Sequence, residues 1–163
     1  MNRVTQQAKY ENYTPPSQYD VLLSDVGHID LIENISQRLN VIYLSRGEVG
    51  YLKSVDGILY GTNARPMVNL VVSSKYHKVP INMIFMVDTC SPSLFVCDLA
   101  MKALGFTDDI PTNFDLCFGG STHEAVRKEG RYKNINIIGA TFLTKMRAKV
   151  TVDYKNNQVT LDF

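Results

Sequence analysis

Apolar residues between positions 66 and 163 occur in short runs that turn residues separate, a pattern typical of β-strands. The last two runs alternate apolar and polar residues about Lys155-Asn156-Asn157, which predicts a closing hairpin. The gap around Gly119 and Gly120 predicts another hairpin. The strands expected from these runs lie at residues 67–72, 79–87, 114–118, 123–127, 134–138, 149–154 and 158–163.

Two short helices are expected among these strands. Asp98 can cap a helix that extends to Leu104, and Gly105 can end it. The residues at 140–146, which follow Gly139, favour one or two further helical turns. The pattern from residue 66 onward therefore predicts a mainly β domain that carries little helix.

The first 65 residues have a different pattern. Residues 1–20 are polar and predict a tail or a linker. At 30–39, Asp30 and Glu33 fit a capping box and the apolar residues share one face, which predicts an amphipathic helix. Short strands are expected at 40–44, 51–53 and 58–60. We expect this region, residues 1–65, to be a small α/β extension that adds an edge strand or a cover to a domain at residues 66–163.

Composition excludes several classes of partner. The chain has 163 residues, of which 17 are basic and 16 acidic, and a net charge of +1 argues against nucleic acid or an anionic membrane as the main partner. No apolar run approaches the ~20 residues that a transmembrane helix needs, and residues 1–13 lack the apolar core of a secretory signal. The cysteines, Cys90, Cys97 and Cys117, form an odd set without a C-x-x-C pair, so we expect free thiols and a cytoplasmic location.

Candidate chemistry concentrates at residues 82–97. An apolar run leads directly into Asp88, and after Thr89, Cys90, Ser91 and Pro92 a second apolar run follows. A carboxylate at a bend between two strand-like runs is partly desolvated, which is costly without a purpose. Asp88 is therefore the first candidate for a functional residue, and a plain turn cap in a β-barrel is the alternative.

Three stretches of residues 66–163 resemble the retropepsin-like aspartic proteases, the single-lobe type that retroelements encode. Residues 85–92, FMVDTCSP, are similar to the active-site motif in which two hydrophobic residues precede D-[ST]-G-[SA]. Residues 135–143, INIIGATFL, are similar to the second motif, an apolar strand that ends in Gly before a helix. Residues 148–163 are similar to the closing hairpin of that family. The resemblance implies a retropepsin-like acid protease barrel with one or two short helices.

The resemblance also implies an activity, the hydrolysis of peptide bonds without a cofactor or a metal. Two carboxylates held together share one proton, so that one acts as base and the other as acid. Because a single-lobe chain has one such acid, the family forms a homodimer in which Asp88 of each chain would contribute to the dyad. The implied substrate is a polypeptide. The implied supporting residues are Thr89, Cys90 and Ser91 in the loop, Gly139 behind the loop, and Gly119 and Gly120 as a flap over the substrate.

Departures from the family pattern keep other hypotheses open. Cys90 stands where the family has Gly, so the domain is alternatively an inactive retropepsin-like module for dimerisation or protein binding. Ala140 and Thr141 also differ from the viral pattern. Gly119-Gly120 is alternatively a plain hairpin turn, and Asp108-Asp109 is expected to be a solvated turn. A Cys90 nucleophile would need a base such as His123. His28, His77 and His123 lack metal-ligand spacing, so no metal site is expected.

Overall fold

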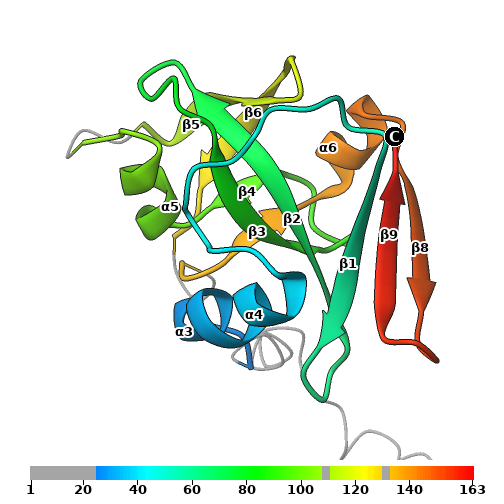
Figure 1. Cartoon of the computed structure of the whole chain (residues 1–163). Helices are drawn as coiled ribbons and strands as arrows, with labels where there is room; N and C mark the ends of the chain where they lie inside the picture. The colour runs from blue at the N-terminus through cyan, green and yellow to red at the C-terminus, as the bar shows by residue number, and fades with distance from the viewer. Residues whose placement is uncertain (1–24, 108–110, 130–132) are drawn as a thin grey trace, which may run out of the picture.

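The centre of the fold is a closed barrel of six strands (Figure 1). The computed structural model describes residues 25–107, 111–129 and 133–163. Around the barrel the strands follow the order β3-β7-β4-β6-β5-β2, and β2 pairs with β3 to close the ring. These strands are β2 (Arg65–Ser74), β3 (Ile81–Val87), β4 (Phe95–Val96), β5 (Asn113–Phe118), β6 (Ser121–Arg127) and β7 (Asn136–Ile138). The predicted fold class, a mainly β barrel with short helices, is confirmed.

Three further strands extend the sheet away from the barrel, at the right of Figure 1. They are β1 (Ser54–Tyr60), β9 (Gln158–Asp162) and β8 (Lys149–Asp153). Strand β2 makes this branch possible, because Arg65 to Met67 pair with β1 whereas Val72 to Ser74 pair with β5. The predicted hairpins β2–β3, β5–β6 and β8–β9 are all present as antiparallel pairs.

A continuous helical segment precedes the sheet and covers one face of the barrel. It consists of α3 (His28–Asp30), a π-helical turn η2 (Leu31–Ile35) and α4 (Ser36–Leu39), so the predicted helix exists and begins two residues earlier than expected. Its buried residues Leu31 and Ile35 pack on Ile84 and Met86 of β3, while Phe85 and Val87 face the barrel core. Strand β3 is thus buried on both faces, which explains its uninterrupted apolar run.

Details of the predicted start of the helix and of the strands that follow were wrong. Gly27 is the N-cap, and Asp30 is the third helical residue, whose Oδ2 accepts the Gly27 N–H at 2.9 Å. Asn40 has a left-handed φ of 52° and ends the helix. Residues 40–44 and 51–53 are not strands. The chain between 40 and 53 forms turns and an extended segment, and an isolated antiparallel bridge joins Arg46 to Ile81.

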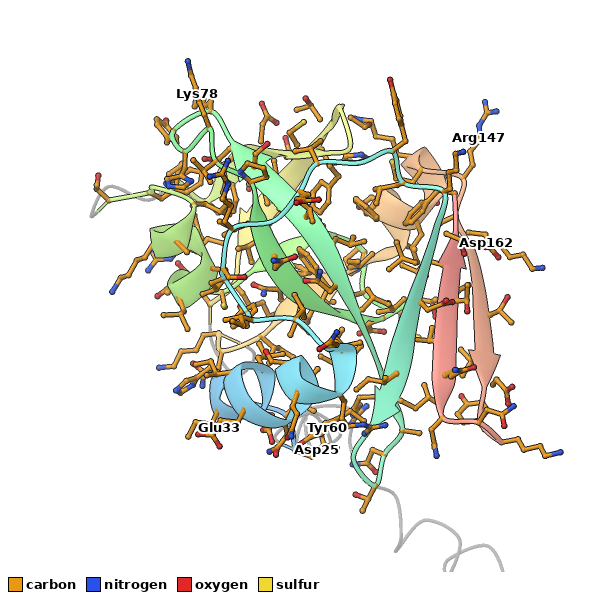
Figure 2. The ribbon with its side chains drawn as sticks, viewed as in Figure 1. Asp25, Glu33, Tyr60, Lys78, Arg147 and Asp162 are labelled. Atoms are coloured by element: carbon orange, nitrogen blue, oxygen red, sulfur yellow. The ribbon has the colours of Figure 1, made fainter. Side chains whose placement is uncertain are left out.

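The N-terminal region is not joined to the barrel as an edge strand. Strand β1 lies between β2 and β9 inside the sheet, so the predicted edge position was wrong, whereas the helical segment does provide the predicted cover. Two polar contacts fasten the segment near the β1–β2 turn: Tyr60 Oη donates to Asp30 Oδ1 at 2.8 Å, and Arg65 pairs with Asp25 at 3.3 Å. Figure 2 shows Asp25 and Tyr60 at this end of the molecule. A domain boundary at residue 65 stays a prediction.

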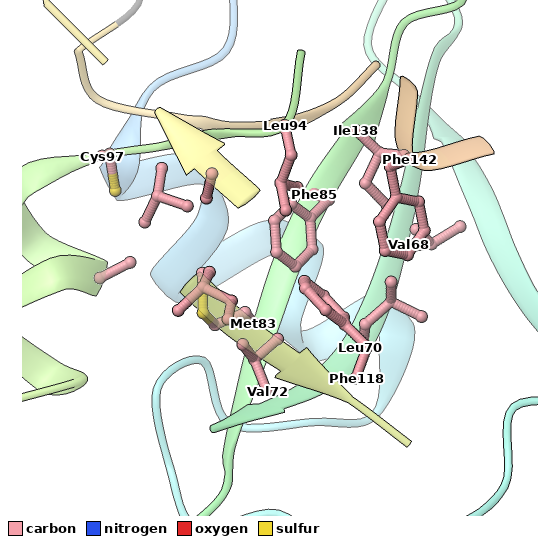
Figure 3. Packing of buried hydrophobic residues seen from close by; sticks show 14 of the residues in the cluster. Val68, Leu70, Val72, Met83, Phe85, Leu94, Cys97, Phe118, Ile138 and Phe142 are labelled. Atoms are coloured by element: carbon pink, nitrogen blue, oxygen red, sulfur yellow. The ribbon is translucent and has the colours of Figure 1, made fainter. Parts of the chain in front are cut away.

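The barrel interior is a single apolar cluster that reaches α6 (Ala140–Lys145) and α5 (Asp98–Ala103). Figure 3 shows Phe85, Phe118 and Phe142 turned toward one another, with ring centroids 5.9 Å apart for Phe85–Phe118 and 4.9 Å apart for Phe118–Phe142. Helix α5 ends before Gly105, as predicted, but its N-cap is Cys97 rather than Asp98. The Asp98 carboxylate instead accepts Arg127 Nε at 2.9 Å. No helix in the described ranges is long and apolar enough to cross a membrane.

Candidate active-site loop

Asp88 lies at the point where β3 leaves the barrel. Its N–H donates to Ile138 O of β7 at 3.0 Å, which extends the parallel β3–β7 pairing by one residue. The chain then turns back, since Ser91 N–H donates to Asp88 O at 3.1 Å. The Asp88 side chain is half-buried, and its Oδ1 accepts the Cys90 N–H at 3.0 Å. The backbone therefore fixes the orientation of the carboxylate.

The start of α6 holds the second half of this loop, residues 88–93. Ala140 N–H donates to Ser91 O at 2.7 Å, and Thr141 N–H donates to Pro92 O at 3.0 Å. The Thr141 hydroxyl donates to the same Pro92 oxygen at 2.7 Å. N–H groups in the first turn of a helix have no partner within the helix, so binding the loop satisfies donors that would otherwise need water.

Gly139 permits this contact between the loop and the helix. A Cβ built at residue 139 would lie 2.5 Å from Ser91 O and would overlap Ser93 O as well. These are backbone atoms, which cannot move aside as a flexible side chain does. Gly139 has an extended φ of −104°, so the requirement for glycine comes from space and not from the backbone conformation.

The structure places Thr89 and Cys90 at the exposed tip of the loop. Cys90 is a free thiol, and it is absent from the residues with a positive φ, so its backbone conformation does not demand glycine. Among the described residues, the Thr89 hydroxyl makes no hydrogen bond that would orient the loop within one chain. Cys90 therefore places an exposed side chain beside the carboxylate without backbone strain.

Gly119 and Gly120 lie far from Asp88 in the chain's own fold. They form the β5–β6 turn with φ values of 54° and 87°, and Gly119 packs against Gly50 and Leu52. Phe118 pairs with Val72 of β2, whereas Met86 pairs with Met67, near the other end of that strand. At ~3.3 Å per residue, five residues of β2 separate the two pairings by roughly 17 Å. Within one chain, the turn does not cover Asp88.

A buried polar network around Asn136 was not predicted from the sequence. Asn136 is fully buried in β7, where its Nδ2 donates to Tyr43 Oη at 2.8 Å and to Ile84 O at 3.0 Å, and its Oδ1 accepts the Cys97 N–H at 3.0 Å. The sequence signal that could have revealed this network is Asn136 itself, a single polar residue inside the apolar run at 135–138. Burial raises the pKa of the Cys97 thiol and of the Tyr43 hydroxyl, so both groups stay neutral.

His123 does not act as a partner of Cys90 in this structure. It is buried on β6, and its ring contacts both Phe118 and Phe142, with centroids 5.6 Å and 4.7 Å away. No hydrogen bond joins it to Cys90 among the residues that the structure describes. In the same described ranges, no group of three or more His, Cys, Asp or Glu residues could hold a metal ion.

The sequence was compared with protein families and curated proteins, and the structure with solved structures. No family model matches the sequence, and no curated protein matches it. The structure is similar to the crystal structure of a retropepsin-like aspartic protease from Rickettsia conorii, with a TM-score of 0.45 and 17% sequence identity. The match covers 71% of this chain and 92% of that chain.

Proposed function

We propose that this protein is an aspartic endopeptidase that acts as a homodimer, with Asp88 of each copy in one catalytic dyad. The observation that carries the proposal is the fixed carboxylate of Asp88, half-buried at the end of β3 and bound through Oδ1 to Cys90 N–H. No other hydrogen bond or ion pair of this carboxylate occurs within the described residues. Oδ2 is thus left for a water molecule, a substrate or a second carboxylate.

The chemistry needs both carboxylates. Two carboxyl groups about 3 Å apart cannot both ionise easily, so one stays protonated. The ionised Asp88 removes a proton from water, and the water oxygen attacks the peptide carbonyl carbon. The protonated Asp88 gives its proton to the carbonyl oxygen. The Asp88 that took the water proton then gives it to the nitrogen as the C–N bond breaks. A hydroxyl of the tetrahedral intermediate returns its proton to the other Asp88, so the dyad recovers its starting state.

The exposed edge of β8 supports a dimer. Among the residues that the structure describes, β8 pairs only with β9, so its other edge presents backbone groups that no described strand pairs. Two copies of β8 that pair antiparallel about Thr151 would set Lys149 of each opposite Asp153 of the other, an attractive cross-strand arrangement. Helix α6 connects the Asp88 loop to β8, so a dimer through this edge involves the elements that hold the loop.

The direct test compares Asp88→Asn with the unaltered protein on a peptide library, at mildly acidic and at neutral pH. Loss of an essential carboxylate is expected to lower kcat/KM by roughly 10³-fold or more, since the amide can neither accept nor share the proton. Asp115→Asn is the matched control, because Asp115 is exposed on β5. Equal cleavage by the unaltered protein and Asp88→Asn would refute the proposal.

A second candidate function is a catalytically inactive module for dimerisation or protein binding. Two observations favour it: Cys90 places a thiol beside the carboxylate, and the β5–β6 turn does not cover Asp88 within one chain. Cys90→Gly discriminates between the candidates. Activity that appears only in this variant would support the inactive module, whereas full activity of the unaltered protein would exclude it. Sedimentation analysis of both proteins checks that the dimer is unaffected.

A further inference from the structure

His123 is a titratable side chain placed in the core of the barrel. It is 3% exposed and points to the same side of the sheet as Leu116, its cross-strand partner on β5, and as Phe118, whose ring it contacts edge-on. Its Nε2 is buried and has no hydrogen-bond partner among the described residues. A buried imidazole without a partner is tolerated while neutral, because protonation would bury an uncompensated charge.

The charged groups around His123 would not balance the positive charge of a protonated ring. Helix α6 contributes Lys145, whose positive charge opposes protonation, and whose Nζ donates to Thr122 O at 2.6 Å. Glu124 follows His123 on β6 and therefore points to the other side of the strand, although it lines the same 330 Å³ pocket. The facing residues of β5 and of the loop, Leu116, Phe118 and Ser93, carry no charge.

The ring is connected to the Asp88 loop through α6. Phe142, whose ring centroid lies 4.7 Å from that of His123, follows directly on Ala140 and Thr141. The N–H groups of these two residues hold Ser91 O and Pro92 O. Any outward movement of Phe142 and Lys145 away from a charged ring would therefore pull on the hydrogen bonds that hold the loop.

We propose that His123 is a proton-sensitive support of the Asp88 loop. The neutral ring packs under α6 and keeps the loop in place, and the protonated ring displaces α6 and loosens the loop. This role goes beyond the proposed peptidase activity and does not depend on it, because the measured quantities below are structural.

The direction of the pH effect follows from linkage. Burial, and to a smaller extent the Lys145 charge, lowers the pKa of His123 below its usual value of 6.5. In an opened state, in which α6 has moved away and the ring reaches water, the group takes up its proton near 6.5, so below this pH the opened state binds more protons than the closed state. The stability of the closed loop is therefore lost as the pH falls from 6.5 to the pKa of His123 in the closed state. Over that interval the equilibrium constant for opening rises by up to about tenfold per pH unit.

The first measurement is an NMR titration of the histidine ring protons in the full chain. The resonances of the three histidines are assigned with His28→Gln and His77→Gln. We expect the midpoint of His123 to lie below the usual value of 6.5, because the ring is buried and faces Lys145. A His123 midpoint at or above 6.5 would overturn the proposal.

The second measurement is amide hydrogen exchange, corrected for the intrinsic pH dependence, at pH 7.5 and pH 5. The protection of Ala140 and Thr141 should fall at the lower pH by up to about tenfold per unit. Val41 is the reference, since its N–H donates to Ser36 O at 3.0 Å just after the end of the N-terminal helical segment. Equal changes at all three amides would show global destabilisation and would refute a role specific to the loop.

Substitutions show whether the acid-induced loss of protection comes from His123 or from another titrating group. In His123→Gln and His123→Phe, the acid-induced loss of protection at Ala140 and Thr141 should disappear, and in His28→Gln it should persist. Persistence in a folded His123 variant would overturn the proposal. If neither variant folds, the titration and the exchange of the unaltered protein still decide, because each has an outcome that contradicts the proposal.

Discussion

The Asp88 loop and the Gly119-Gly120 turn both connect strands of one barrel, but different interactions stabilise them. Three parts of the chain hold the loop: β7 binds Asp88 N–H, α6 binds Ser91 O and Pro92 O, and Gly139 leaves the space. The turn depends on the left-handed φ angles of its own two glycines, which match the twist of a hairpin. A loop that other elements hold can keep a side chain in a fixed orientation, and this is what a catalytic carboxylate requires.

This difference predicts which glycine is more costly to replace. Gly139→Ala would push a methyl group into Ser91 O and Ser93 O, and relief requires a backbone shift of the loop or of α6. We expect a loss of about 3 kcal/mol in the free energy of unfolding, at the upper end of overpacking effects. Urea unfolding measures the loss. Hydrogen exchange at Ala140 and Thr141 should show that it concentrates at the loop.

Gly27→Ala is the control for this substitution. Gly27 also lies at the N-cap of a helix, but the nearest atom to an added Cβ is Asp30 Oδ2 at 3.9 Å, an ordinary contact. We therefore expect a cost well below that of Gly139→Ala. Equal costs at the two positions would mean that close packing against the loop contributes nothing.

Gly119→Ala is expected to have an intermediate effect. An alanine at a φ of 54° costs about 1–2 kcal/mol, and its Cβ would lie 3.1 Å from Gly50 O. Because this turn lies at the other end of β2, the exchange protection of Ala140 and Thr141 should not change. A loss of protection at these amides would show that turn and loop are coupled, contrary to the comparison.

The sequence predicted the parts of the fold that depend on local pattern. The hairpins β2–β3, β5–β6 and β8–β9 follow from apolar runs and turn residues, which act over a few positions. The parts that failed depend on distant contacts. Residues 40–44 look like a strand, yet Tyr43 is buried beside Asn136 outside the sheet and Ile42 is exposed. Similarly, no local signal places β1 between β2 and β9.

The candidate site likewise has a part that the sequence predicted and a part that it did not. The position of Asp88 at the end of a buried strand was visible in the sequence, because an acid follows an uninterrupted apolar run. The hydrogen bonds from Ala140 and Thr141 were not visible, since they join residues about fifty positions apart. His123 was equally hidden, because one histidine in an alternating strand gives no sign of which neighbours enclose it.

The smallest expected effect concerns the hydroxyl of Thr141, which also donates a hydrogen bond to the Asp88 loop. Thr141→Val removes the hydrogen bond to Pro92 O but keeps the side-chain shape and the N–H bond to the same oxygen. Because Pro92 O keeps one donor and the site is exposed, the expected loss is about 0.5–1 kcal/mol. Thr144→Val is the matched control, since Thr144 is exposed on the same helix. If both substitutions cost the same, the hydroxyl does not help to hold the loop, and the backbone bonds from α6 suffice.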